Sequence, residues 1–261
     1  MSVLHDFLVF GLVGLVAQFI DGALGMAYGI TASSFLLAAG VPPAHTSASV
    51  HIAKFFTTAA SGAAHASYNN VDRRLLLTLA IAGAVGGAFG ALVVTSVDAS
   101  LIKPFIIGYL ALMGVVILWR ILRTTPQIAL PKQGVAPLGM LGGFLDAIGG
   151  GGWGPIVTTS LIGRGGEPRM IIGSVNAAEF FVTLAIGSAL IATIVTGHWK
   201  DAGDILNNAA AIAGLIVGGL ISAPIAGRFV SVVPRKVLGV AVGLLVLTLA
   251  GYQAAALTGL L

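Results

Sequence analysis

Hydrophobic residues gather along this chain in eight long runs separated by short polar connections. The runs fall at 7–39, 44–66, 73–95, 101–122, 134–163, 169–196, 205–227 and 236–258. Most of them are close to the roughly 20 apolar residues that a helix needs to cross a lipid bilayer. The pattern therefore predicts an all-α polytopic membrane protein.

The first and fifth runs are longer than the others and are interrupted by glycines. The interruptions read FIDGALGMAYG at 19–29 and FLDAIGGGGWGP at 144–155. Each glycine costs about 1 kcal/mol of helix propensity relative to alanine, and a proline removes a backbone donor. Backbone that leaves a helix inside the bilayer must be buried in protein or line a watery cavity. We therefore predict that both runs are broken or re-entrant, and that the paired breaks mark a binding site.

The two interrupted runs also begin two similar halves. Without gaps, residues 19–62 match 144–187 at 15 of 44 positions, and these matches include aspartate, proline and serine as well as glycine. Ala- and Gly-rich helices imitate one another by composition, but matched polar residues are harder to explain in that way. We predict two repeats of about four hydrophobic segments each, within one integral membrane domain. The first repeat covers 1–123, the connecting loop 124–133 and the second repeat 134–261.

Composition narrows the class of protein further. Only 8% of the residues are charged and 57% are hydrophobic, whereas soluble domains carry about 25% charged residues. The net charge of +4 comes from basic residues dispersed beside the hydrophobic runs, so membrane lipid is expected as a partner and nucleic acid is not. The chain has no cysteine, which excludes disulfides, thiolate catalysis and Cys-ligated metals.

The placement of the basic residues predicts how the halves are oriented. If all eight runs crossed the membrane, six basic residues would lie on each side, against the positive-inside rule. If the first and fifth runs instead return to the side they entered, ten share one face and only Lys103 and Lys200 lie opposite. This second arrangement makes the repeats inverted. It predicts that both termini lie in the periplasm.

Polar residues at helical spacing form a stripe along the second run: Ser47, His51, Lys54, Thr58, Ser61 and His65. The repeat places Glu179 at the position that corresponds to Lys54. One interpretation is a structural ion pair, because charges inside membranes usually pair with one another. In the other, Lys54 attracts an anionic substrate while Glu179 balances its charge or exchanges a proton. The two interpretations overlap, since a substrate can displace an ion-pair partner.

Asp21 and Asp146 precede the glycines of the two interruptions and also allow two interpretations. A carboxylate at the edge of a broken helix can cap exposed backbone donors, or a desolvated acid can carry a coupling proton. Half-helices that begin near Gly29 and Gly154 would present backbone amides to an anion. Tight packing through small residues is the alternative for these glycines.

The remaining candidates exclude some kinds of site. His51 and His65 are fourteen residues apart on one helix, which is about 21 Å along its axis, so they cannot share a metal ion. Tyr28 and Trp153 occupy matched positions, where they either line a pocket or wedge between helices. No motif of an enzyme appears, and we expect neither a metal nor a cofactor.

The interrupted motifs and the stripes resemble the sulfite exporter family of the TauE/SafE type, also described as toluene-sulfonate uptake permeases. The likeness spans nearly the whole chain and is carried by IDGALGMAYG (20–29), SASVHIAKFFTTAASG (47–62), FLDAIGGGGWGP (144–155) and IGSVNAAEFFVTLAIG (172–187). It implies a carrier of sulfur-containing anions such as sulfite, sulfoacetate or another sulfonate, usually outward across the bacterial inner membrane. The residues by themselves indicate a small anion but do not specify sulfur.

We therefore predict a secondary transporter that exports such an anion by alternating access. Uptake of a carboxylate or sulfonate, and a membrane assembly subunit that transports nothing, are the alternatives, and a homodimer is left open. The candidate substrate-binding residues are Tyr28, Gly29, Ser49, His51, Lys54, Thr58, Trp153, Gly154, Ser174 and Asn176. The candidate coupling or ion-pair residues are Asp21, Asp146 and Glu179.

Overall fold

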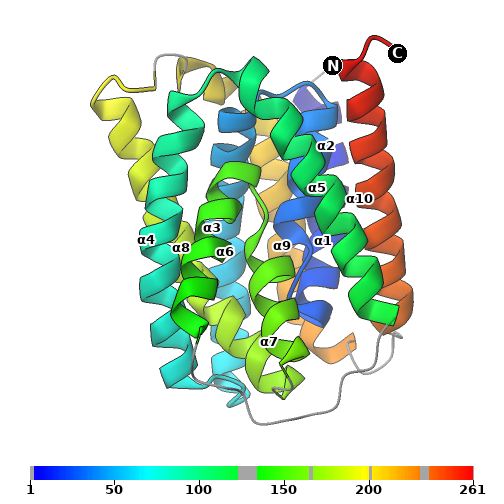
Figure 1. The fold of residues 1–261 in the computed structure, drawn as a ribbon. Helices are drawn as coiled ribbons and strands as arrows, with labels where there is room; N and C mark the ends of the chain where they lie inside the picture. Colours follow the sequence, from blue (N-terminus) through cyan, green and yellow to red (C-terminus); the bar gives the residue numbers. More distant parts are fainter. Residues whose placement is uncertain (1–2, 123–133, 165–166, 200–201, 230–234, 261) are drawn as a thin grey trace.

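The computed structural model describes residues 3–122, 134–164, 167–199, 202–229 and 235–260, and the described residues contain helices but no strand (Figure 1). The α-helices are α1 (Val3–Leu24), α2 (Tyr28–Ala38), α3 (Pro43–Ser67), α4 (Arg73–Ser96), α5 (Ala99–Leu122), α6 (Val135–Gly149), α7 (Thr159–Gly163), α8 (Pro168–Val195), α9 (Ala209–Phe229) and α10 (Arg235–Leu257). A π-helical turn, η1 (Gly154–Thr158), precedes α7, and a 3-10 helix, η2 (Ala202–Asn208), precedes α9.

Six helices of the described residues are long and apolar enough to cross a membrane: α1, α4, α5, α8, α9 with the end of η2, and α10. The prediction of an all-α polytopic membrane protein is thereby confirmed. Helix α3 has 25 residues and is long enough to cross the membrane, but its polar stripe lowers its mean hydropathy. The helix can carry this stripe because the polar side chains are buried among the other helices. The predicted connecting loop at 124–133 lies outside the described residues.

Both interrupted runs are broken as the sequence predicts. Helix α1 ends at Leu24 and α2 begins at Tyr28, while α6 ends at Gly149 and is followed by η1. Gly25 and Gly150, which are matched in the repeat, end the two helices with φ of +66° and +67°. A left-handed backbone is strained for residues with a side chain, so glycine at both positions stops the helix. The two elements differ in length, since α1 has 22 residues and α6 has 15.

The first helix of each half packs against a helix of the other half. Helix α1 lies along α9, and α6 lies along α4. Both contacts bring backbones together through a glycine: a β-carbon at Gly218 would overlap the Gly11 carbonyl oxygen, and one at Gly86 would overlap the Met140 carbonyl oxygen. Small residues at such positions let membrane helices approach closely.

Corresponding helices run in opposite directions. Figure 1 shows both termini at one end of the bundle, with α1 starting at that end and α6 starting at the other. The central helices α3 and α8 are antiparallel, so that Phe55 packs on Phe180 and Gly62 lies on Ala177. These directions are the ones that an inverted repeat requires. The division into repeats at 1–123 and 134–261 stays a prediction.

Candidate functional site

The two helix breaks cross each other in the middle of the bundle. A β-carbon at Gly29 would lie 2.7 Å from both the carbonyl oxygen of Gly150 and the α-carbon of Gly151. One at Gly151 would overlap the backbone between Gly29 and Ile30. The chain therefore needs glycine here because two backbones touch, and the crossing brings residues from the two halves into one place.

Each break is capped by its own aspartate. Asp146 Oδ1 accepts hydrogen bonds from the backbone nitrogens of Gly152 at 2.8 Å and Trp153 at 3.1 Å. Asp21 Oδ1 accepts one from the backbone nitrogen of Tyr28 at 3.2 Å. The sequence predicts that backbone amides at the breaks bind an anionic substrate, but in the structure these two carboxylates accept their hydrogen bonds. A carboxylate at a helix start satisfies free donors and complements the helix dipole.

Lys54 joins both halves at this crossing. Its Nζ lies 2.7 Å from Asp146 Oδ2, 2.9 Å from Asp146 Oδ1 and 2.7 Å from Glu179 Oε1, and the lysine is 1% exposed. His51 lies one turn earlier on α3, with Nε2 3.1 Å from Asp146 Oδ2. The symmetry partners Lys54 and Glu179 therefore form an ion pair, and Asp146 is a second partner of the same lysine.

These side chains surround a small polar chamber with a free volume of about 10 Å³, roughly the room of one water molecule. It is lined by Asp21, Ala27, Gly29, Ile30, Lys54, Asp146, Gly151, Gly152, Gly154, Pro155 and Glu179. Charges that are buried away from water are costly unless they are paired, and inside membranes they mark functional positions. The chamber is therefore the candidate functional site.

Tyr28 and Trp153 anchor the broken segments rather than line the chamber. The Tyr28 hydroxyl donates to the Leu215 carbonyl at 3.0 Å, and Trp153 Nε1 donates to the Val175 carbonyl at 3.1 Å. Each ring packs against a glycine of a neighbouring helix, Gly219 for Tyr28 and Gly83 for Trp153. Of the two interpretations of this matched pair, the contacts favour wedges between helices.

The structure places the other predicted binding residues beside the chamber or away from it. Thr58 donates to the Lys54 carbonyl at 2.6 Å, one turn further along α3. Asn176 Nδ2 lies 3.4 Å from His65 Nε2. Ser49 is buried outside the chamber lining. Ser174 accepts from the Asp72 backbone nitrogen at 2.8 Å, at the end of the bundle opposite the termini.

Several residues of the chamber were missed in the sequence. Ala27, Ile30, Gly151, Gly152 and Pro155 contribute backbone and small side chains to the lining. All five belong to the interrupted motifs or directly follow them. The signal that could have found them is the break itself, because backbone that leaves a helix inside the membrane must face a cavity or buried protein.

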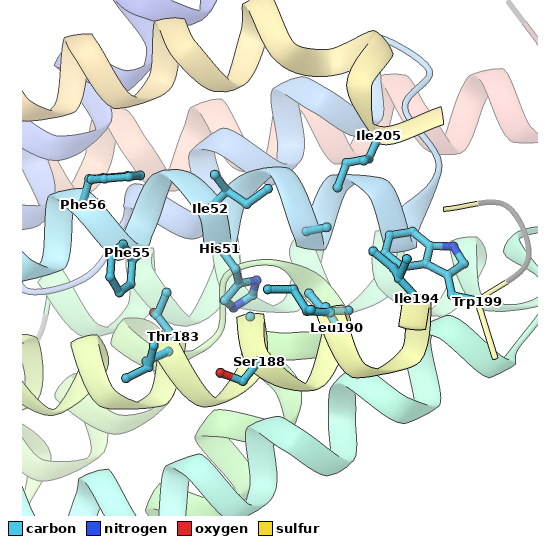
Figure 2. Close-up of a pocket in the computed structure, with 14 residues that line it drawn as sticks. His51, Ile52, Phe55, Phe56, Thr183, Ser188, Leu190, Ile194, Trp199 and Ile205 are labelled. Atoms are coloured by element: carbon cyan, nitrogen blue, oxygen red, sulfur yellow. The ribbon is translucent and has the colours of Figure 1, made fainter. Parts of the chain in front are cut away.

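An apolar groove between α3 and α8 reaches the same site from the lipid-facing side. Figure 2 shows the His51 ring pointing into this groove, among Phe55, Leu190 and Thr183. The other edge of the ring contacts Asp146. His51 thus separates the charged chamber from the apolar surface.

The two ends of the bundle differ. At the end that holds the termini, a larger cavity opens between the start of α3, the α4–α5 turn and the segment that follows α8, and it is lined by His45, Ser96, Asp98 and His198 among others. At the opposite end, Arg169 donates to the Tyr68 carbonyl at 3.0 Å and to the Asn70 side chain. These contacts tie the α3–α4 connection to the first turn of α8 at that end.

Membrane-crossing helices arranged around a charged chamber at two crossing helix breaks define a membrane transport protein. Comparison with known proteins gives the family. The chain belongs to the sulfite exporter TauE/SafE family, whose profile matches residues 10–253. It is 39% identical over 243 residues to the protein of Bacillus subtilis (strain 168) called "Probable membrane transporter protein YtnM", covering 90% of this chain and 78% of that protein. No solved structure matches the chain.

Proposed function

We propose that this transporter exports a small sulfur-containing anion, such as sulfite, sulfoacetate or another sulfonate, across the bacterial inner membrane. The observation that carries the proposal is Lys54, a buried cation between two carboxylates at the crossing of the helix breaks. An anion that enters the chamber replaces one carboxylate at Lys54 and so keeps the lysine paired. The family's description as sulfite exporters supports sulfur as the central atom.

Size and exposure agree with a small solute. The chamber leaves only about 10 Å³ free, and every charged side chain in its lining is less than a tenth exposed. Such a site suits an anion of few atoms that takes the place of a carboxylate and whose oxygens accept hydrogen bonds from Lys54. It gives no room to a large apolar body without movement of α3 against α8.

Alternating access is the mechanism we propose for this site. A wide cavity at the terminal end and the Arg169 contacts at the other end support a state that is closed on one side. Rocking of the halves about the crossing of the breaks would exchange the two ends. A potential that is negative inside favours the exit of an anion that moves by itself, by about 2.3 kcal/mol per charge per 100 mV.

Flux measurements test the proposal directly. Purified protein in proteoliposomes is expected to move sulfite, thiosulfate, sulfoacetate or methanesulfonate, with protein-free vesicles as the control. Acetate serves as the carboxylate competitor. Movement of acetate alone would support the rival carboxylate carrier, and the absence of flux for every anion would support an assembly subunit and overturn the proposal.

The proposed orientation places both termini in the periplasm. Because the chain lacks cysteine, Thr258→Cys and Ser67→Cys each introduce the only thiol, at exposed positions on opposite ends of the bundle. In intact spheroplasts, a membrane-impermeant maleimide is expected to label Thr258→Cys and to leave Ser67→Cys unlabelled until the membrane is opened. The reverse pattern would place the termini in the cytoplasm.

A further inference from the structure

The chamber contains more acids than bases. Three carboxylic acids line it, Asp21, Asp146 and Glu179, together with one lysine. His51 contacts Asp146 from just outside. If all the acids were ionised, the group would carry an excess of negative charge even with a protonated imidazole. An anion would be repelled by such a site, so the acids have to be accounted for before an anion can bind.

The excess of acids arises because the two aspartates of the repeat have different neighbours. Asp146 from α6 meets Lys54 and His51 from α3, which gives an acid with basic partners. In the repeat, Glu179 and Asn176 of α8 occupy the positions that correspond to Lys54 and His51. Asp21 of α1 therefore meets an acid where Asp146 meets a base. Asp21 and Glu179 line the same chamber and interact electrostatically. Two carboxyl groups that share a buried site are stable when one proton is held between them.

The contacts also show which carboxylate can yield its place at Lys54. Asp146 is held by Lys54, by His51 and by the backbone nitrogens of Gly152 and Trp153. Glu179 meets Lys54 through Oε1 at 2.7 Å and lies at the edge of the chamber, with its side chain 8% exposed. An incoming anion therefore displaces Glu179 more readily than Asp146, because less has to be broken.

We propose that the Asp21–Glu179 pair carries one exchangeable proton, and that this proton crosses the membrane together with the anion. This inference rests on the proposed function. When the anion replaces Glu179 at Lys54, the freed Glu179 and Asp21 take up one proton from water on the open side and share it. When the anion leaves on the other side, the proton is released there and Glu179 returns to Lys54. One proton and one anion are moved in each cycle.

The ionisable groups around the pair come from several helices. They are Asp21 on α1, Tyr28 on α2, His51, Lys54 and His65 on α3, Tyr109 on α5 and Asp146 on α6. His51 and Asp146 are already engaged with each other. The Tyr28 hydroxyl donates to a backbone carbonyl, and so does that of Tyr109. His65 lies beside Asn176, one turn from Glu179, and is the alternative proton acceptor that the experiment has to exclude.

The first experiment measures protons on the unaltered protein. Thiosulfate and methanesulfonate stay ionised near neutral pH, so a proton taken up on binding must go to the protein. In weakly buffered detergent solution, addition of either anion is expected to raise the pH by an amount that corresponds to one proton per anion bound. Binding with no proton uptake would overturn the inference and leave the proposed function standing. No binding or flux of any anion would overturn the proposed function itself.

Variants then assign the proton to the pair. Glu179→Gln is expected to bind anion without proton uptake, and flux of methanesulfonate, electroneutral in the parent, is expected to respond to membrane potential. Glu167→Gln, an exposed change just before α8, is the matched control and is expected to keep one proton per anion. His65→Gln should do the same. Loss of proton uptake in His65→Gln alone, or flux that requires sodium and takes up no proton, would overturn the assignment. If Glu179→Gln does not fold, Asp21→Asn provides the second test of the pair.

Discussion

Replacing Lys54 by methionine is expected to abolish anion flux in proteoliposomes while the protein remains in the membrane. The substitution removes the chamber's one lysine and leaves Asp146 and Glu179 without their shared cationic partner. Leaving a buried charge unpaired costs about 3–5 kcal/mol. The transported anion loses the same charged contact with Lys54, and a loss of this size corresponds to a decrease in flux of at least about 100-fold. Initial rates, normalised to the amount of reconstituted protein, measure it.

Two companions separate the loss of the site from the loss of the fold. Lys103→Met makes the same chemical change at a half-buried position on α5, outside the chamber, and is expected to retain flux. Lys54→Met combined with Glu179→Gln removes one of the stranded charges, so it is expected to recover thermal stability but no flux. If Lys54→Met transports at the parental rate, the lysine is a structural cation and the proposed mechanism fails.

Much of the fold could be predicted because a helix that crosses a membrane must consist mainly of apolar residues. Runs near 20 apolar residues give the crossing helices, and the runs at 73–95 and 236–258 agree with α4 and α10 to within one residue at each end. The breaks could be predicted because glycines interrupt the apolar sequence at 19–29, and glycines with a proline interrupt it at 144–155. The difference in length between α1 and α6 was not visible, since periodicity does not locate where a helix meets the end of the bundle.

Only those contacts of the site that join matched positions of the two halves could be predicted from the sequence. Matching the halves identified Lys54 and Glu179 as partners, and the structure places them 2.7 Å apart. The second contact of Lys54, with Asp146, joins α3 of one half to α6 of the other. That contact depends on the depth at which the breaks cross, which backbone packing at Gly29 and Gly151 determines. No spacing within one segment contains this information.

Ser174 shows what a match in the repeat does not determine. It matches Ser49, yet its hydroxyl accepts a hydrogen bond from the Asp72 backbone nitrogen near the end of the bundle. Matched sequence places residues at equivalent depths in the two halves, but the halves run in opposite directions. A residue one turn too early along α8 therefore lies toward one face of the membrane while its counterpart on α3 lies toward the other. Only residues near the crossing are brought together.

Gly151→Ala is expected to produce the largest loss of stability of any single methyl addition in the chamber. Its β-carbon would overlap the Gly29 carbonyl carbon and the Ile30 nitrogen, so the two breaks would have to separate. Neither neighbour is a flexible side chain, so relief requires movement of the backbone in both halves. We expect a loss of at least about 3 kcal/mol, the upper range for overpacking. The measurement is the thermal unfolding of detergent-purified protein, followed with the yield of monodisperse protein.

Gly108→Ala is the matched control for this prediction. It adds the same methyl group within α5 at an exposed position, where no atom lies within 4 Å of the new β-carbon. Alanine in place of glycine inside a helix stabilises it by up to about 1 kcal/mol, so the melting temperature is expected to stay or to rise. A Gly151→Ala protein as stable as the Gly108→Ala protein would mean that the two breaks do not touch. The chamber would then lack the rigid crossing on which Asp21 and Asp146 are positioned, and a transport cycle pivoting there would have no physical basis.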